Sequence, residues 1–224
     1  MAKINLKTLA YNTIKQKIVQ CEYAPGTDLN EEMLTVELKT SRTPIRDALS
    51  RLEQEGLIEI RPKKGITVTP LSAREINMIF ELRNMYEPHI LMNYGENIDQ
   101  KQLKYFYDIF SKENRDSKCF KDNDFYYELD TSLHQLIVSA CPNTYIQNDY
   151  NLIRTQSERF RYLTGNKSNN RLEDTFKEHL DIIVPCLNKE WAAATEKLIY
   201  HLEESKKATF QLVFETLEDS IITF

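Results

Sequence analysis

The stretch from Ser41 to Gly56, SRTPIRDALSRLEQEG, decides how the first third of the chain folds. Its apolar residues recur at helical spacing, which predicts a short helix. We expect the buried face of this helix to consist of Ile45, Ala48, Leu49 and Leu52. Ser41 or Thr43 is the expected N-cap of the helix, and Gly56 is the residue expected just beyond its C-terminus.

The other face of this helix carries basic residues. Arg42 and Arg46 lie one turn apart near its start, and Ser50 and Arg51 lie on or near the outer surface. Arginines at the N-terminus of a helix, mounted on a small helical unit, are typical of proteins that read the major groove of DNA. The alternative is that the arginines form surface salt bridges, for example Arg46 with Glu53, which contribute little to stability.

Two further helices are expected before this one. The spacing of leucine and isoleucine predicts a first helix over about residues 5–20, and the Pro25-Gly26 pair predicts the turn that follows it. Asn30 is a good N-cap for a second helix. The inward-facing residues of that second helix are expected to be Met33, Leu34 and Leu38.

A hairpin is expected after the arginine-bearing helix. Residues 57–71, LIEIRPKKGITVTPL, fit two short strands around a Pro-Lys-Lys-Gly turn. The order of three helices and a hairpin predicts a winged helix-turn-helix domain over residues 1–71. Lys63 and Lys64 would lie at the tip of the wing, where they either contact DNA phosphates or form an ordinary solvated turn.

The rest of the chain, residues 72–224, contains no convincing strand. A linker at 70–72 precedes apolar residues that recur at helical spacing, with a Pro-Asn break at 142–143. The pattern predicts an all-helical bundle of six or seven helices. The expected helices cover about 72–94, 103–110, 125–137, 144–163, 171–188 and 190–218. The predicted fold class is therefore mostly α, with a winged helix-turn-helix domain followed by a helical bundle.

Charge is distributed unevenly along the chain. Residues 1–70 contain 11 Lys+Arg and 9 Asp+Glu, whereas residues 71–224 contain 18 and 25. The chain is acidic overall, but its first part keeps enough basic residues for a nucleic-acid partner. The four cysteines are far apart and form no CxxC pair, which argues against a disulfide framework or a zinc finger. We expect a cytoplasmic protein, because neither a signal peptide nor a run of about 18 apolar residues occurs.

Three of the four histidines lie where a helical bundle would bury them. Asp130 and His134 are four residues apart and share a helix face, and His179 and His201 each lie on an apolar helix face. Imidazoles from different helices, joined by a carboxylate, form a site suited to Zn, Ni or Mn. From the residues alone, each of these histidines is more often a hydrogen-bonded core residue than a ligand.

Residues 10–70 resemble the DNA-binding domain of the GntR-type bacterial regulators. The matching residues are Ile18, Pro25-Gly26, Leu29 with Glu31, the run 41–49, Leu52-Glu53, 55–58, Gly65 and Val68. Residues 73–224 resemble, more loosely, the FCD-type effector domain of the FadR subfamily. The chain departs from the family at Lys39-Thr40, where many members have Gly-Val, and at Glu32, where some place a basic phosphate contact.

The resemblance implies a role for each basic residue of the first domain. The recognition helix would enter the major groove, where Arg42 and Arg46 would read guanines and Thr43 would contact a base or a phosphate. The remaining residues expected to contact DNA are Ser41, Arg51, Lys63, Lys64 and Gly65.

For the second domain the resemblance implies one divalent transition metal per chain, either Zn, Ni or Mn. The implied ligands are Asp130, His134, His179 and His201. In the subfamily the metal holds a small organic acid. Arg83 lies on an otherwise apolar helix face and needs an anionic partner, which is either Glu87 at i+4 or an effector carboxylate.

Two further residues are candidates for the same effector site. Arg159 is the weaker one, and Asn143 either lies near the ligand or only caps the following helix. His89 matches nothing in the family and is expected at the surface.

Together the residues and the resemblance imply a homodimeric transcriptional regulator that is not an enzyme, with repression as the commoner pattern in the family and activation as the alternative. It would bind a pseudo-palindromic operator in double-stranded DNA and respond to a small carboxylate. One alternative is a metal-dependent enzyme with an appended DNA-binding domain, because three histidines around a metal also resemble a metallohydrolase site. A second alternative is a fatty-acyl pocket without metal, against which the presence of all four implied ligands argues.

Overall fold

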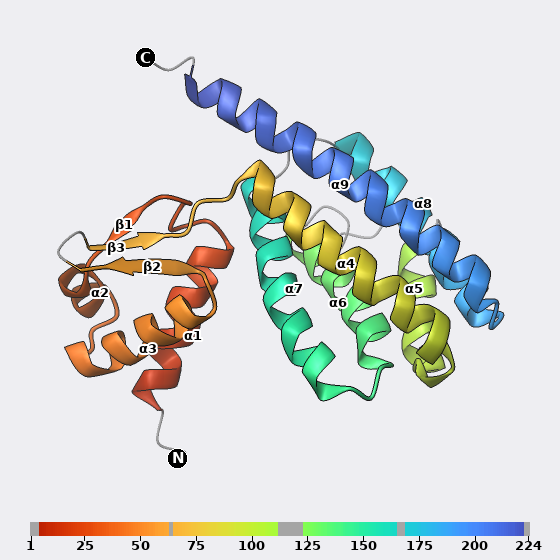
Figure 1. Ribbon diagram of the computed structural model, residues 1–224, viewed down its shortest axis with the longest axis horizontal. Coiled ribbons are helices and arrows are strands. Elements are labelled where there is room, and N and C mark those ends of the chain that lie inside the picture. Colours follow the sequence, from red (N-terminus) through yellow and green to blue (C-terminus); the bar gives the residue numbers. More distant parts are fainter. Residues whose placement is uncertain (1–4, 63–64, 112–122, 165–168, 222–224) are drawn as a thin grey trace. The chain divides into compact units, whose positions relative to one another are not determined.

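The computed structural model describes residues 5–62, 65–111, 123–164 and 169–221. The chain divides into two compact units, Met1–Ser72 and Ala73–Phe224. Figure 1 shows the small sheet of the first unit and the helices of the second. None of the helices in the described ranges is both long enough and apolar enough to cross a membrane.

The first unit is a winged helix-turn-helix, as predicted. Its elements are α1 (Leu6–Val19), β1 (Asp28–Leu29), α2 (Glu31–Glu37), α3 (Arg42–Gln54), β2 (Ile58–Arg61) and β3 (Gly65–Val68). The strands form an antiparallel sheet in the order β1-β3-β2, in which Ile66 of β3 lies opposite both Leu29 and Ile60. The two-residue strand β1 was not predicted, because its only strand partner is β3, far along the chain. Lys63 and Lys64 lie outside the described residues.

The core of this unit forms where the apolar faces of its helices meet. α1 packs against α3, and the predicted stripe on α3 is buried throughout. Burying one large apolar side chain stabilises the folded state by about 1.5–3 kcal/mol. The fully buried members include Ile14, Ile18, Leu34, Ile45, Leu49, Leu52 and Leu57.

Local hydrogen bonds define where α2 begins and where α3 ends. The Asn30 side chain accepts a hydrogen bond from the Met33 N–H at 2.7 Å, as expected of an N-cap. Ser41 occupies the N-cap position of α3, but its side chain makes no capping bond. Gly56 follows α3 with a φ of +68°, and the Leu57 N–H donates to the Leu52 carbonyl at 2.9 Å. This is a Schellman motif, which requires a left-handed residue such as glycine.

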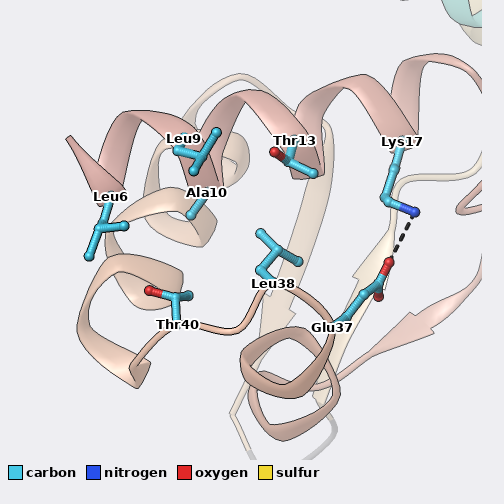
Figure 2. Close-up of a pocket in the computed structure, with 8 residues that line it drawn as sticks. All are labelled: Leu6, Leu9, Ala10, Thr13, Lys17, Glu37, Leu38 and Thr40. Carbon is cyan, nitrogen blue, oxygen red and sulfur yellow. Dashed lines mark ion pairs between the residues drawn. The ribbon is translucent and has the colours of Figure 1, made fainter. Parts of the chain in front are cut away.

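A groove of about 230 Å³ lies between α1 and the segment that joins α2 to α3 (Figure 2). Its lining is mostly apolar at the N-terminal end of α1, where Leu6 and Leu9 are half exposed. At the other end Lys17 and Glu37 form an ion pair of 2.9 Å. The complete lining is Leu6, Leu9, Ala10, Thr13, Lys17, Glu37, Leu38 and Thr40.

The second unit is an all-helical bundle, as predicted. Over the described ranges its elements are α4 (Ala73–Tyr94), η1 (Gly95–Asn97), α5 (Gln100–Phe110), α6 (Asn123–Ser139), α7 (Thr144–Thr164), α8 (Asn169–Leu187) and α9 (Trp191–Ile221). These six α-helices lie within the predicted six or seven. α4 and α9 run side by side, and α8 packs on both α9 and α5 (Figure 1).

The helix α4 has two contrasting faces. Its inner face packs against α6, α7 and α9 and includes two charged residues, Arg83 and Glu87, which are buried. Its outer face carries four large apolar side chains that are 38–61% exposed. Successive members are four, three and seven residues apart along the chain. We call these four residues the apolar stripe: Met78, Leu82, Met85 and Met92.

Candidate metal centre and nucleic-acid interface

Four potential metal ligands meet in the core of the second unit. Asp130 and His134 come from α6, His179 from α8 and His201 from α9. One ligand atom from each lies within 4.8 Å of all the others, and all four side chains are buried. The structure therefore brings together the four residues that the resemblance implied.

The facing nitrogens of two histidines are spaced to share a cation. The His134 Nδ1 lies 2.6 Å from Glu87 Oε2, and the His201 Nδ1 lies 2.8 Å from Glu178 Oε2. Each carboxylate accepts a hydrogen bond from Nδ1–H, which leaves a lone pair on each Nε2. These two Nε2 atoms are only 3.2 Å apart. Two lone pairs at this distance repel each other, so the pair fits a shared metal ion.

The third imidazole also fits a metal. His179 is fully buried, yet neither of its ring nitrogens has a hydrogen-bond partner within the described part of the chain. Its Nε2 faces Asp130 Oδ1 at 3.3 Å. An unpaired buried polar atom costs about 1–3 kcal/mol. Coordination through Nε2 would remove that cost.

The protonation states of His179 and His201 also suit metal binding. Burial, reinforced by the neighbouring imidazoles, holds the pKa of His201 well below its ordinary value. Burial also lowers the pKa of His179, although Asp130 partly opposes it. Both rings are therefore neutral at physiological pH, which is the form that binds metals.

Asp130 supplies the negative charge of the cluster. Burial alone would raise its pKa, but Arg161 and His179 outweigh burial and hold the pKa well below its ordinary value. The Arg161 Nη2 lies 2.8 Å from Asp130 Oδ2, while Oδ1 faces His179. One carboxylate oxygen is thus held by a guanidinium, and the other is directed at the cluster.

Glu87 connects the cluster to Arg83. It accepts hydrogen bonds from the Arg83 Nε at 2.6 Å and from the Tyr150 hydroxyl at 2.7 Å, in addition to its contact with His134. Of the two partners considered for Arg83, the structure contains the i+4 carboxylate. The Nη2 of Arg83 is buried and has no partner in the described ranges. This atom remains available to an anionic ligand.

The other effector candidates lie in different surroundings. Asn143 is exposed at the start of α7, where its side chain accepts a hydrogen bond from the Tyr145 N–H at 3.0 Å. This is the capping role that the sequence left open. Arg159 is fully buried, and its Nη1 donates to Gln156 Oε1 at 2.8 Å. His89 is exposed, as expected.

Sequence reasoning did not single out three residues that hold the cluster in place. Glu178 binds His201, Tyr150 binds Glu87, and Arg161 binds Asp130. Tyr150 and Arg161 are eleven residues apart on α7, which is three turns and therefore the same face. That spacing was the available signal, but it identifies no partner without the bundle geometry.

The candidate DNA-reading residues lie on α3. Arg42, Thr43 and Arg46 are all exposed at its N-terminal end. Arg46 does form a salt bridge, with Glu31 of α2: its Nε lies 2.8 and 2.9 Å from the two carboxylate oxygens. Glu53, the partner considered from sequence, instead accepts a hydrogen bond from the Ile60 N–H.

The remaining DNA candidates are more dispersed. The Arg51 guanidinium lies 3.7 Å from the centre of the Tyr11 ring on α1, so it is engaged by the domain itself. Ser41 is exposed at the N-cap of α3, and Gly65 opens β3 with a φ of +107°. Ser41, Arg42, Thr43 and Arg46 thus lie at the N-terminal end of α3, and Arg51 lies in its last turn.

Comparison with known families agrees with this architecture. Residues 6–68 match the family model of bacterial regulatory proteins of the gntR family. Residues 78–204, more than half of the chain, match the model of the FCD domain.

Similar proteins cover nearly the whole chain. The HTH-type transcriptional repressor RspR of Escherichia coli K12 is 26% identical over 202 residues, which are 90% of this chain and 88% of RspR. The gluconate operon transcriptional repressor of Bacillus licheniformis is 27% identical over 171 residues, 75% of this chain and 68% of that protein.

Solved structures share the fold. A GntR-type regulator from Rhodococcus sp. RHA1 has a TM-score of 0.78 at 16% identity and covers 92% of this chain and 97% of its own. The Zn²⁺-bound FCD domain of TM0439 has a TM-score of 0.55 at 23% identity and covers 65% of this chain and 98% of its own.

Proposed function

Since the chain belongs to the GntR family of bacterial regulatory proteins and carries an FCD domain, we propose that it is a metal-dependent, effector-controlled repressor of transcription. It binds a specific operator through its first unit. It binds a small organic acid beside a divalent metal in its second unit. The names of two relatives, both repressors, support the sign of regulation.

The buried cluster is the observation that carries this proposal. Asp130, His134, His179 and His201 would hold one divalent ion, and Glu87 and Glu178 would fix the orientation of two of the imidazoles. When bound, the ion supplies positive charge that attracts an anionic group of a ligand. Three nitrogens and one oxygen suit Zn, Ni or Mn.

The path from ligand to DNA would begin at α4. Arg83 and Glu87 lie on this helix, and Glu87 also binds His134, so a ligand that engages Arg83 alters contacts at the cluster and on α4 together. α4 begins at Ala73, the first residue after the DNA-binding unit. The protein would exist in one conformation that binds DNA well and another that binds it poorly. The effector changes DNA affinity to the extent that it binds one of these conformations more tightly than the other.

We assign DNA reading to the exposed end of α3. Arg42 and Arg46 would pair with guanines in the major groove, with Thr43 beside them, and the wing would lie near the phosphates. The protein acts as a homodimer, so each α3 reads one half of a pseudo-palindromic operator. As a bacterial regulator it works in the cytoplasm, where the chromosome lies.

The apolar stripe on α4 supports the homodimer. Four large apolar side chains at heptad-like spacing are exposed on one face of a well-packed helix. A second copy can present the same stripe, and self-complementary packing of this kind is typical of twofold dimers. An exposed apolar patch of this type marks an interaction surface.

Metal analysis tests the cluster first. Purified protein that has not been chelated should contain about one divalent ion per chain by plasma mass spectrometry, an expectation that follows from the four-ligand cluster found among the described residues. His179→Ala should lose the ion. His89→Ala is the matched control, because His89 is exposed and away from the cluster, and it should keep the ion. Full occupancy in His179→Ala would contradict the proposed metal site.

Selection of duplexes from a random library tests the DNA-binding function. Wild-type protein should enrich a two-part, pseudo-palindromic sequence, and Arg46→Ala should lose preference at one base position per half-site. Metal-loaded protein should then change its operator affinity when small carboxylates are added, whereas His179→Ala should not. Turnover of such an acid by the purified protein would favour an enzyme instead.

A further inference from the structure

Arg46 is exposed, yet its guanidinium is held in one orientation. Its side chain is 65% exposed, and both carboxylate oxygens of Glu31 lie within 2.9 Å of its Nε. An exposed pair of this kind adds little to the stability of a fold. The contact therefore matters less for the fold than for the orientation that it gives Arg46.

Glu31 extends from the capped start of a helix. It is the first residue of α2, directly after Asn30, whose side chain caps that helix through the Met33 N–H. Its side chain is 30% exposed, less than half the exposure of Arg46. Glu31 is the shorter and less exposed member of the pair, so its carboxylate limits the orientations that the longer Arg46 side chain can adopt.

The geometry leaves one edge of the guanidinium free. Arginine has one Nε donor and two terminal nitrogens, Nη1 and Nη2. Glu31 occupies Nε, and neither terminal nitrogen of Arg46 makes a hydrogen bond within the described ranges. A bidentate contact with the O6 and N7 atoms of guanine uses two such donors. Of the possible donor pairs, only the two terminal nitrogens remain available.

We propose that Glu31 is a positioning residue that makes Arg46 specific for guanine. This inference rests on the proposed DNA-binding function. By holding Nε, Glu31 restricts the rotamers of a long exposed side chain before DNA arrives, so less conformational entropy is lost on binding. Its negative charge near DNA also opposes binding in which Arg46 merely contacts a phosphate. Glu31 thus favours base contact over non-specific contact.

Glu32 provides a matched control. It is the next residue on α2, is exposed, and carries the same charge, but its side chain holds no arginine. Glu31→Ala and Glu32→Ala remove equal charge from the same turn of the same helix. Any difference between the two variants therefore reports the contact with Arg46.

The experiment is duplex selection from a random library with full-length wild type, Arg46→Ala, Glu31→Ala, Glu32→Ala and the double variant Glu31→Ala/Arg46→Ala. Arg46→Ala first identifies the base position that Arg46 reads. Glu31→Ala should reduce guanine preference at that position by roughly tenfold, within the range expected for a bidentate pair. Glu32→Ala should keep the wild-type preference, and both glutamate variants should bind random DNA equally well or more tightly.

The double variant and the salt dependence separate positioning from charge. If Glu31 acts only through Arg46, the double variant should show the same base preference as Arg46→Ala alone. The slope of affinity against salt should change equally in Glu31→Ala and Glu32→Ala. Circular dichroism should show that both variants retain their helix content.

Three results would overturn the inference. Wild-type guanine preference in Glu31→Ala excludes positioning. Equal loss of preference in Glu31→Ala and Glu32→Ala assigns the effect to charge alone. If the wild type selects no sequence at all, the proposed function fails and this inference fails with it, whereas the first two results leave the proposed function intact.

Discussion

The Glu87 carboxylate contacts three polar side chains at once. Its two oxygens receive Arg83, His134 and Tyr150 in a fully buried environment. Burial alone would raise its pKa, but Arg83 and His134 outweigh burial and keep the pKa below its ordinary value. The carboxylate is therefore ionised, and it neutralises a guanidinium that is only 4% exposed.

Glu87→Gln should destabilise the second unit by about 3–5 kcal/mol, because it leaves the buried charge of Arg83 uncompensated. Glu81→Gln, on the exposed face of the same helix, should have almost no effect. Chemical denaturation followed by helix content measures both. Equal unfolding midpoints for the two variants would show that Arg83 is neutralised by another group.

Glu178→Gln should weaken metal binding by about 10- to 100-fold, the usual effect of losing a carboxylate that orients a ligating histidine. The neutral amide can present either its carbonyl oxygen or its NH2 group to Nδ1, so it fixes the His201 tautomer that directs Nε2 at the cluster less firmly and makes the ring less basic. Glu173→Gln, exposed on the same helix, is the control. The measurement is competition for the metal with a chelator of known affinity, and unchanged affinity in Glu178→Gln would contradict the assigned tautomer.

The helices were the most predictable elements. Apolar residues at helical spacing indicate α1, α3 and the long helices of the bundle. The observed ends of these helices differ from the predicted ends by a few residues. The strand β1 could not be found in this way, because two residues have no periodicity. The partners of the metal candidates were also hidden: Arg161 and Glu178 reach Asp130 and His201 only once the helices are packed.

Individual side chains of α3 were less predictable than the helix itself. The guanidinium of Arg51, an expected DNA contact, lies over the Tyr11 ring of α1, a contact that the sequence did not indicate. A partner for Arg46 was considered on its own helix, and the structure provides one on α2 instead. Sequence spacing orders the residues along one helix, whereas these contacts depend on which neighbouring helix lies beside it.

Gly56→Ala should loosen the end of α3. Its φ of +68° is strained for a residue with a Cβ, although no atom lies within 4 Å of the added carbon. The expected cost is about 1 kcal/mol. Amide hydrogens at the C-terminal end of α3 should then exchange about fivefold faster in native-state hydrogen exchange. Ser50→Ala, on the exposed face of the same helix, is the control, and equal exchange in both would contradict the Schellman motif.

At the scale of the whole molecule, the proposed homodimer depends on the apolar stripe. Leu82→Glu combined with Met85→Glu places two charges on each copy of that surface, and like charges facing each other should prevent association. The variant should sediment with the mass of one chain while retaining its helix content. It should also bind a full operator more weakly than the wild type, because two half-sites are no longer joined.

Asn148→Glu is the control for this variant, since it adds a charge at an exposed position of α7. It should sediment like the wild type. A Leu82→Glu/Met85→Glu protein that still sediments as a dimer would place the subunit contact on a different surface.

Two faces of the helix α4 are constrained. One side carries Arg83 and Glu87 into the polar core, another carries the apolar stripe, and its first residue directly follows the DNA-binding unit. In evolutionary terms such a helix drifts slowly, because most substitutions disturb one of these roles. A lineage that acquires a new effector would therefore do so mainly through substitutions on neighbouring helices, and α4 would change last.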